Sequence, residues 1–164
     1  MSKRSQTCGD VEKQLSFALY GAANRVVRMH RPFLEPLSLT FPQYLVILAL
    51  LDVTSASVGA IGAKLGMDNS TVTPLLKRME KSGLLARRRD IDDERRVLVE
   101  LTLAGCALRT SVLAVSSRVM GQCQIMDSQA DDLRQVLDAL GRPADVATCN
   151  MPNERAASGE LTVS

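Results

Sequence analysis

The chain has 164 residues and a formal net charge of +2, with 46% hydrophobic residues, 23% charged residues, four cysteines and one histidine. This length and composition fit one soluble globular domain with a core of its own. The sequence has no apolar run of the roughly 18 residues that span a membrane, no secretory signal and no cysteine spacing of the zinc type, which favours a cytoplasmic protein without a metal or other cofactor.

The first predicted element is a long amphipathic helix over residues 10–31. Its apolar residues recur every three or four positions, which places them on one helical face. Pro32 is expected to end or kink this helix. A second, strongly apolar and buried helix is expected over Phe41–Leu51, with Thr40 as its N-cap. A polar break is expected at residues 52–56.

A short helix and a tight turn follow. Ser57 can cap a helix over Val58–Leu65, and Gly66 supplies the positive φ that a helix end favours. A further helix is expected from Asp68 or Asn69, either of which can cap it, to about residue 81 or 82. These features predict two helices joined by a turn.

Pro74 lies inside the second of these helices. It has no amide hydrogen and cannot complete the helical hydrogen-bond ladder. Either the first turn is therefore irregular, or the regular helix starts near Thr73.

Two β-capable runs, Leu84–Arg89 and Arg96–Leu101, are joined by a charged segment and predict a hairpin. Thr102 is expected to cap a helix from Leu103 to about Gly121. A last helix is expected from residue 127 or 128 to Leu140. The elements together predict a mainly α fold with a small β-hairpin wing, which is a winged helix-turn-helix.

The helix over residues 69–81 is suited to the major groove of DNA. It has small polar side chains at its front and basic ones further along, while Val72, Leu75, Leu76 and Met79 form its buried stripe. Taken alone, the front is also compatible with a capping run, and the basic residues with a solvated face. The ordered combination with the basic segment 77–89, in which Glu80 is the one acidic residue, favours DNA.

The tip of the hairpin carries four acidic residues, Asp90, Asp92, Asp93 and Glu94, beside Arg95 and Arg96. Bare carboxylates repel phosphate, so we expect Asp93 to orient Arg95, which then enters a minor groove. The alternative is a charged turn that only keeps the hairpin soluble. We predict DNA contacts from Asn69, Ser70, Thr71, Thr73, Lys77, Arg78, Lys81, Arg87, Arg88, Arg89, Asp93, Arg95 and Arg96.

These residues resemble the MarR family of dimeric winged-helix regulators, and most closely its organic hydroperoxide-sensing (OhrR) subgroup. The stretch Asp93-Glu94-Arg95 is similar to the D-x-R wing signature of that family. The other similar stretches are QLSFALY at 14–20, LTFPQYLVILAL at 39–50, TVTPLLKRMEKSGLL at 71–85, RRRDIDDERRV at 87–97 and LTLAGCALR at 101–109.

The resemblance implies one domain over residues 10–140, with the winged helix-turn-helix at about 41–101 and dimerisation helices at about 10–31 and 103–140. Residues 1–9 and 141–164 are expected to be a flexible lead and a disordered tail. The family implies a homodimer that binds double-stranded DNA at a pseudo-palindromic operator as a repressor, with a role in the oxidative-stress response.

The sensing residues depart from the subgroup pattern. Ser16 stands where the subgroup has a peroxidatic cysteine, and His30 and Phe41 stand where two tyrosines hydrogen-bond that cysteine. A serine cannot form a sulfenic acid. Either Ser16 is an engineered change that mimics the reduced form, or the site has diverged and its oxidation control has given way to a small ligand. The expected sensor or ligand pocket contains Ser16, Tyr20, His30, Phe41 and Cys123.

Two parts of this pocket have competing interpretations. His30, with Arg25 or Arg28 nearby, could anchor a partly apolar or anionic ligand, or it could be a surface residue near a helix end. Cys123 lies near the segment that supplies a resolving cysteine in some subgroup members. A redox pair with Cys8 is an alternative, but inert thiols are favoured, with Cys106 buried.

Other function classes have little support. One histidine, no G-x-S-x-G motif and no phosphate-binding glycine loop argue against an enzyme. A winged-helix module that binds protein would favour a neutral reading helix, and the basic charge of residues 77–89 argues against it.

Overall fold

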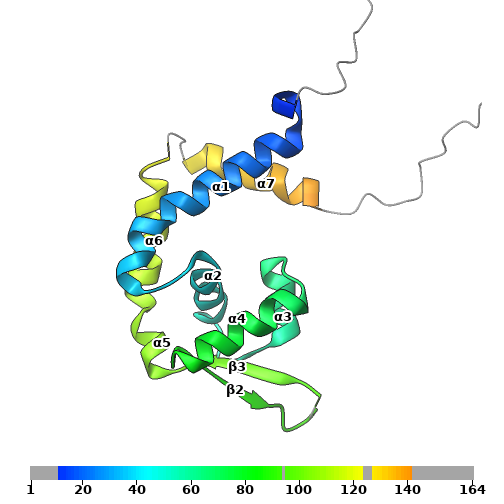
Figure 1. Ribbon diagram of the computed structural model, residues 1–164, viewed down its shortest axis with the longest axis vertical. Helices are drawn as coiled ribbons and strands as arrows, with labels where there is room; N and C mark the ends of the chain where they lie inside the picture. Colours follow the sequence, from blue (N-terminus) through cyan, green and yellow to red (C-terminus); the bar gives the residue numbers. More distant parts are fainter. Residues whose placement is uncertain (1–10, 94, 124–126, 142–164) are drawn as a thin grey trace, which may run out of the picture. The chain divides into compact units, whose positions relative to one another are not determined.

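The computed structural model describes residues 11–93, 95–123 and 127–141 (Figure 1). Its contacts divide the chain into a main unit, Met1–Cys123, and a C-terminal unit, Gln124–Ser164. The predictions for residues 1–9 and for residues 142–164 lie outside the described residues, as do Cys8 and Cys149. No single helix of the described part is long and apolar enough to cross a membrane, although Leu15–Leu37 and Phe41–Leu50, bent by 76°, would pass the same test as a pair.

The first α-helix, α1 (Leu15–Leu34), is shifted from its predicted range at both ends. A short 3-10 turn, Val11–Lys13, precedes it where a regular helix was expected. At the other end the helix continues through Pro32 and does not stop there. Pro32 removes one amide near the end of the helix, and the burial of His30 (8% exposed) and Leu34 (2% exposed) holds this last turn in the core.

Helix α2 (Phe41–Leu50) forms as predicted, with the Thr40 amide donating to the Gln43 side chain at 2.8 Å. It runs through the centre of the main unit, and Tyr44, Val46, Ile47, Ala49 and Leu50 are buried. Because these residues point in several directions around the helix, α2 is covered on most sides.

Two basic side chains from other helices close the C-terminal end of α2. Lys64 donates to the Ala49 carbonyl at 3.2 Å, and Arg109 donates to the Leu51 carbonyl at 2.7 Å. The last carbonyl oxygens of a helix have no backbone amide within the helix to accept from. Such contacts therefore satisfy groups that would otherwise need water.

Helices α3 (Val58–Leu65) and α4 (Asn69–Lys81) form the predicted helix-turn-helix. Ser57 caps α3 by accepting from the Ala60 amide at 3.1 Å, and Gly66 ends it with φ of 63°. The structure differs from both interpretations of Pro74, because α4 is a continuous helix from Asn69 through Pro74. The cap at Asp68 and the burial of the stripe that contains Val72 and Leu76 outweigh the loss of one amide.

The sheet has three strands and not two, in the order β1-β3-β2. The hairpin strands β2 (Leu85–Arg89) and β3 (Val97–Leu101) agree with the prediction to within one residue. The additional strand β1 (Ala56–Ser57) pairs antiparallel with Val99 and Leu98 of β3. It lies where the end of the polar break and the Ser57 cap were expected. A strand of two residues shows no alternation, so only its pairing reveals it.

The helix predicted over 103–121 is divided into α5 (Leu103–Ala107) and α6 (Arg109–Met120) at Leu108. Helix α5 contacts β3, whereas α6 contacts α1 and α2, so the chain must change direction between two packing partners. Gly105 permits this approach, because a Cβ there would collide with the Leu84 carbonyl oxygen. Cys106 is exposed, which corrects the expectation that it is buried.

The core of the main unit is aliphatic, as the near absence of aromatic residues implies. It brings together buried residues of α2, α4, the sheet and α6, among them Ile47, Leu50, Leu76, Val99 and Val112. In the C-terminal unit, α7 (Asp127–Gly141) agrees with the predicted last helix to within one residue. It exposes Leu133, Val136, Leu137 and Leu140.

Candidate functional site

The front of α4 is presented by a strong N-cap. The Asp68 carboxylate accepts from the Thr71 amide at 2.8 Å and from the Ser70 hydroxyl. These hydrogen bonds lower the pKa of Asp68, and the bond from Ser70 makes the largest contribution. Asn69 and Thr71 are exposed and Thr73 is half-buried, so the predicted reading side chains lie at or near the surface.

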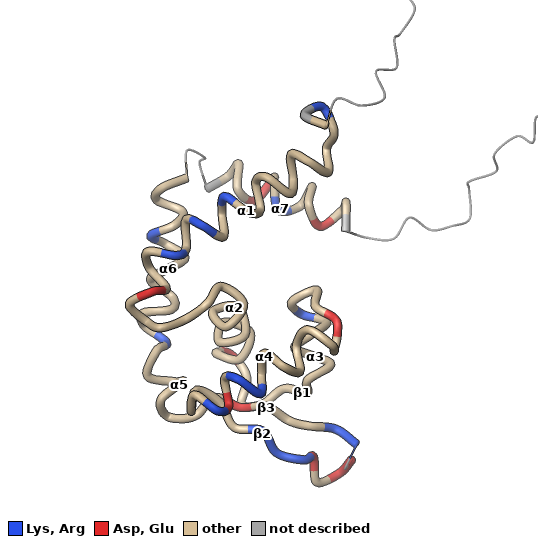
Figure 2. Tube along the Cα trace, in the orientation of Figure 1, with Lys and Arg blue, Asp and Glu red and all other residues tan. Residues whose placement is uncertain are grey.

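The predicted basic residues lie at the end of α4 and along the hairpin (Figure 2), and all of them except the half-buried Arg87 are exposed. Lys77, Arg78 and Lys81 are exposed. In the sheet, Arg87 and Arg88 have different partners, because neighbouring residues of a strand point to opposite faces. Arg87 Nε donates to Glu80 Oε2 at 2.8 Å, and Arg88 Nε lies 3.5 Å from Glu100 Oε2.

The wing tip is organised by its carboxylates. The Asp93 carboxylate accepts from the backbone amide of Arg95 at 3.0 Å, and Asp90 lies 3.8 Å from the guanidinium of Arg96. Asp93 thus orients the turn that carries Arg95, through the backbone. The Arg95 side chain is exposed.

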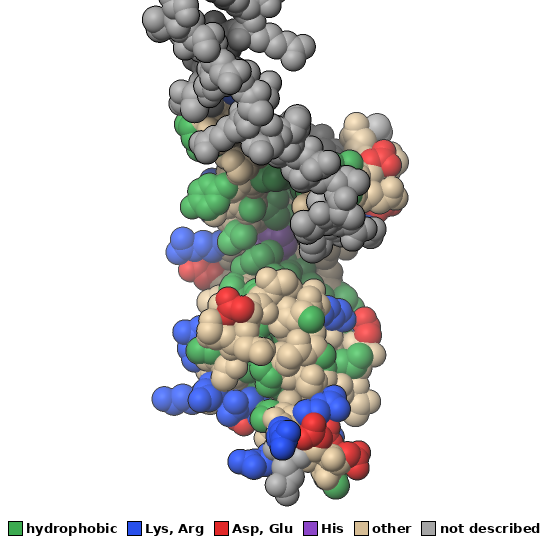
Figure 3. Space-filling view, turned by 90° about the vertical axis from the view of Figure 1, so that its right-hand side faces the viewer, with side chains coloured by type: hydrophobic (Ala, Val, Ile, Leu, Met, Phe, Trp, Pro, Cys, Tyr) green, Lys and Arg blue, Asp and Glu red, His purple; other side chains and the backbone are tan. Residues whose placement is uncertain are grey.

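A hollow of about 440 Å³ separates the helix-turn-helix from the wing. Asn69 and Thr73 of α4 line it together with Arg87, Arg95 and Arg96. Residues predicted separately for the reading helix and for the wing therefore share one concave surface. Figure 3 shows basic side chains at the wing end of the main unit, with acidic ones beside them.

His30 and Phe41 are in contact. Their ring centroids lie 4.8 Å apart in an edge-to-face arrangement, and Tyr44 lies 5.5 Å from His30. His30 Nδ1 lies 2.8 Å from the Val26 carbonyl oxygen, which can only accept, so this nitrogen carries the proton in that bond. The interpretation of His30 as a surface residue is wrong, because its ring packs against α2.

Ser16 is not part of this cluster within one chain. It is exposed in the first turn of α1, and the helix rise of about 1.5 Å per residue places it roughly 20 Å from His30. Tyr20 lies one turn further along α1 and is 70% exposed. Cys123 is half-buried just after α6. Of the predicted sensor residues, a single chain thus brings only His30 and Phe41 together. Ser16, Tyr20 and Cys123 lie elsewhere.

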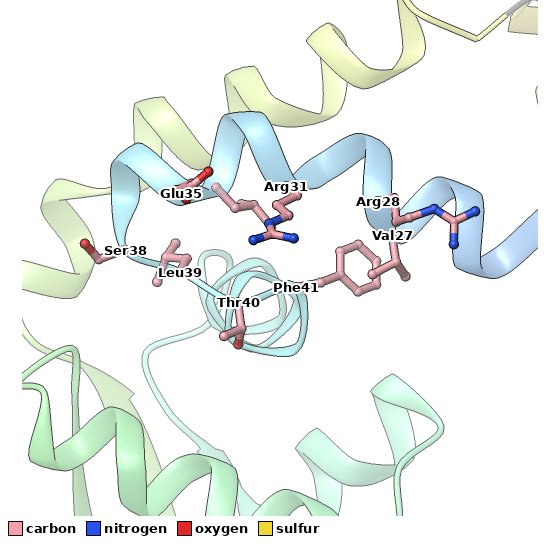
Figure 4. Close-up of a pocket in the computed structure, with 9 residues that line it drawn as sticks. Val27, Arg28, Arg31, Glu35, Ser38, Leu39, Thr40 and Phe41 are labelled. Atoms are coloured by element: carbon pink, nitrogen blue, oxygen red, sulfur yellow. The ribbon is translucent and has the colours of Figure 1, made fainter.

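A pocket of about 430 Å³ lies between α1 and the start of α2 (Figure 4). Val27, Leu34, Leu39 and Phe41 give it apolar walls, and further lining residues are Arg28, Arg31, Glu35, Ser38 and Thr40. Figure 4 shows the Arg31 side chain extending toward the start of α2. Arg31 was missed from the sequence, although its i+3 spacing from Arg28 on one helical face was a usable signal.

The described residues contain no group of three or more His, Cys, Asp or Glu side chains that could hold a metal ion. Burial raises the pKa of Tyr44, and a hydrogen bond with Ser116 opposes this shift.

The family model that matches the chain is that of the MarR family, over residues 39–97. The organic hydroperoxide resistance transcriptional regulator of Bacillus subtilis is 36% identical over 130 residues, which are 79% of this chain and 86% of that protein. The HTH-type transcriptional regulator TtmR of Methylorubrum extorquens is 40% identical over 148 residues, which are 88% of this chain and 74% of that protein.

Solved structures show the same fold. Reduced AbfR bound to DNA superposes with a TM-score of 0.67 at 27% identity, covering 79% of this chain and 89% of that chain. A probable transcriptional regulator from Pseudomonas aeruginosa gives a TM-score of 0.71 at 27% identity, covering 79% and 98%.

Proposed function

Since the chain belongs to the MarR family, we infer that it is a DNA-binding transcriptional regulator that acts as a homodimer. The single observation that carries this function is the shared hollow of α4 and the wing, where a capped helix front meets the side chains of Arg87, Arg95 and Arg96. The relatives are regulators and not enzymes, which supports a non-enzymatic role.

We propose that the protein is a repressor and that its two winged units read a pseudo-palindromic operator. A two-fold dimer places its reading helices about one DNA turn apart, in successive major grooves. The exposed apolar residues of α1, such as Leu15, Phe17 and Tyr20, supply a surface for the partner. In this dimer Arg95 enters the minor groove beside each reading helix.

We further propose that a small, partly apolar anion controls DNA affinity by binding between α1 and α2. Ser16 has no thiol to oxidise, and Phe41 has no hydroxyl to stabilise one. The pocket beside Phe41 instead combines apolar walls with Arg28 and Arg31, which suits an aromatic carboxylate. The contact between His30 and Phe41 supports divergence, because these two replacements fit each other.

A gel shift with the chain's own promoter region, at two salt concentrations, tests the DNA-binding function. We expect specific binding that weakens as salt rises, because phosphate contacts release counterions. Binding that does not distinguish the promoter from a shuffled duplex would contradict a specific regulator.

Benzoate is the probe for the proposed ligand pocket. We expect it to change the DNA affinity of this chain and to have no such effect on Arg31→Gln.

The alternative function is that of a hydroperoxide-sensing repressor held in its reduced form by serine at position 16. The same gel shift with and without an organic hydroperoxide separates the two, using this chain and Ser16→Cys. We expect neither to release DNA. Release by Ser16→Cys alone would identify a disarmed peroxide site, and release by the unchanged chain would identify another cysteine, such as Cys123, as the sensor.

A further inference from the structure

We propose that the hollow between α3, α4 and the wing is a seat for one phosphate of the DNA backbone, and that Glu80 shapes this seat by holding Arg87. The inference rests on the proposed DNA-binding function and adds a ligand and a positioning residue to it. Glu80 is acidic in a segment that faces DNA, so its presence there needs a physical reason.

The sheet register places Arg87 on the inner face. Arg87 pairs with Val99, and Leu85 pairs with Leu101. Leu85 and Val99 are 2% and 0% exposed, so the face that they share is the face turned toward the helices. Arg87 continues this inner face toward the wing, where the core gives way to the hollow.

Glu80 reaches Arg87 from the last part of α4. Glu80 Oε2 accepts from Arg87 Nε at 2.8 Å, with side chains 36% and 23% exposed. The bond occupies the inner nitrogen of the guanidinium, which has two outer nitrogens left to donate to a second anion. Because Arg87 also lines the hollow, the pair directs a planar donor group toward it.

The rest of the hollow has the chemistry of a phosphate site. Arg95 and Arg96 add positive charge from the wing, and Asn69 and Thr73 add an amide and a hydroxyl from the reading helix. Gly59 in the first turn of α3 lies on the same surface, and a Cβ there would meet nothing within 4 Å. Ser57 accepts from the Ala60 amide of this turn, and amides of a first helical turn that a cap leaves unused favour phosphate.

This arrangement explains why an acidic residue is kept beside DNA. A carboxylate close to the backbone weakens binding by repulsion, so its removal should tighten binding if charge alone matters. If Glu80 positions Arg87, its removal should weaken binding. The two explanations therefore predict opposite signs for one substitution.

Glu80→Gln and Glu100→Gln form a matched pair for the test. Each removes one carboxylate that is 36% exposed and that pairs with an arginine of β2. Glu100 pairs with Arg88 on the outer face, away from the hollow. We would measure the affinity of each variant for a promoter duplex and for a shuffled duplex of equal length, over a range of salt concentrations.

We expect Glu80→Gln to lose at least about threefold in affinity on both duplexes, because a phosphate contact carries no base information. Glu100→Gln should bind as the unchanged chain does or more tightly. Arg87→Gln should lower the slope of log affinity against log salt by about one per hollow, with Glu80→Gln lowering it in the same direction. In an Arg87→Gln background, Glu80→Gln should have no further effect.

Glu80→Gln binding as tightly as Glu100→Gln, or weaker binding with an unchanged salt slope, would overturn the seat. If the unchanged chain binds neither duplex, the proposed function fails and the seat fails with it. Arg87→Lys keeps the charge and a donor but loses the planar guanidinium that can bond Glu80 and a phosphate together, so it should also weaken binding. Thermal unfolding of each variant shows whether the fold is intact.

Discussion

Most apolar side chains of residues 56–101 are buried or half-buried within one chain, whereas most of those in the first half of α1 are exposed. Val72, Leu76 and Val99 are each 0% exposed, but Phe17 is 45% and Tyr20 is 70% exposed. The difference teaches that the reading unit is complete in one protomer and that the sensor region is not. If Ser16 and His30 share a site, as we expect from the resemblance, that site needs residues from two chains, because the two lie roughly 20 Å apart on one helix.

The residues that depart from the hydroperoxide-sensing pattern lie outside the reading unit, at Ser16, His30 and Phe41. The reading unit has its helix caps and its turn, and Arg87, Arg88 and Arg96 each pair with a nearby carboxylate. His30 and Phe41 differ together, and they touch each other. A change at one buried ring is tolerated best when the neighbouring ring changes with it.

The largest expected effect is on stability, at the contact between α5 and the reading unit. Gly105→Ala should lower the free energy of unfolding by about 3 kcal/mol, because its Cβ collides with the Leu84 carbonyl. Gly59→Ala is the control, since its Cβ meets nothing within 4 Å, and it should be neutral or slightly stabilising. Urea unfolding at fixed protein concentration measures both. Equal costs would contradict the close packing of α5 against Leu84.

The next effect concerns DNA and not stability. Arg95→Ala should weaken operator binding at least about tenfold, because Arg95 is exposed at the wing and lines the hollow. Arg118→Ala removes an exposed arginine from the last turn of α6 and should leave binding unchanged. Fluorescence anisotropy with a labelled operator compares the two. Equal affinities of both variants would remove the wing from the interface.

A third substitution tests the exposed apolar surface of the first half of α1. Tyr20→Ala should raise the dimer dissociation constant by about tenfold, because a partner covers this side chain in the proposed dimer. Ile91→Ala is the control, as Ile91 is 90% exposed in the wing, outside the helices expected to form the dimer. Analytical ultracentrifugation over a concentration series gives both constants. An unchanged constant for Tyr20→Ala would place the dimer interface elsewhere.

The smallest expected effect is on a cap of the reading helix. The Asp68 pKa is lowered in the folded state, so its stabilisation is present above the unfolded pKa and is lost as pH falls through the lower folded pKa. Asp68→Asn keeps a capping oxygen and should lack this dependence, while Asp68→Ala should lower the melting temperature by a few degrees. Thermal unfolding between about pH 5 and pH 2 compares the three chains. A parallel decline of Asp68→Asn with the unchanged chain would assign the pH dependence to other groups.

Local signals predicted most of the fold. The helix starts at Ser57, Asp68 and Thr102 depend on a side chain that accepts from an amide three residues later, and each of these bonds is present. The positive φ at Gly66 is another such feature. Each depends on a few neighbouring residues, so a sequence pattern is enough to find it.

Long-range packing decided what the sequence did not predict. Strand β1 exists because Ala56 pairs with Val99, and the break at Leu108 exists because α5 and α6 pack on different partners. The burial of His30 follows from contact with Phe41, eleven positions along the chain (41 − 30). The pair of Glu80 and Arg87 likewise requires the turn between α4 and β2 to be known.

The two basic side chains at the end of α2 join this helix to two others. The Ala49 carbonyl is held by Lys64 of α3, and the Leu51 carbonyl is held by Arg109 of α6. Helix α2 cannot slide along its axis without breaking a hydrogen bond to a charged group, at a cost of about 1.5 to 3 kcal/mol each. The C-terminal end of α2 is therefore tied to both α3 and α6, while Phe41, its first residue, packs against His30 of α1.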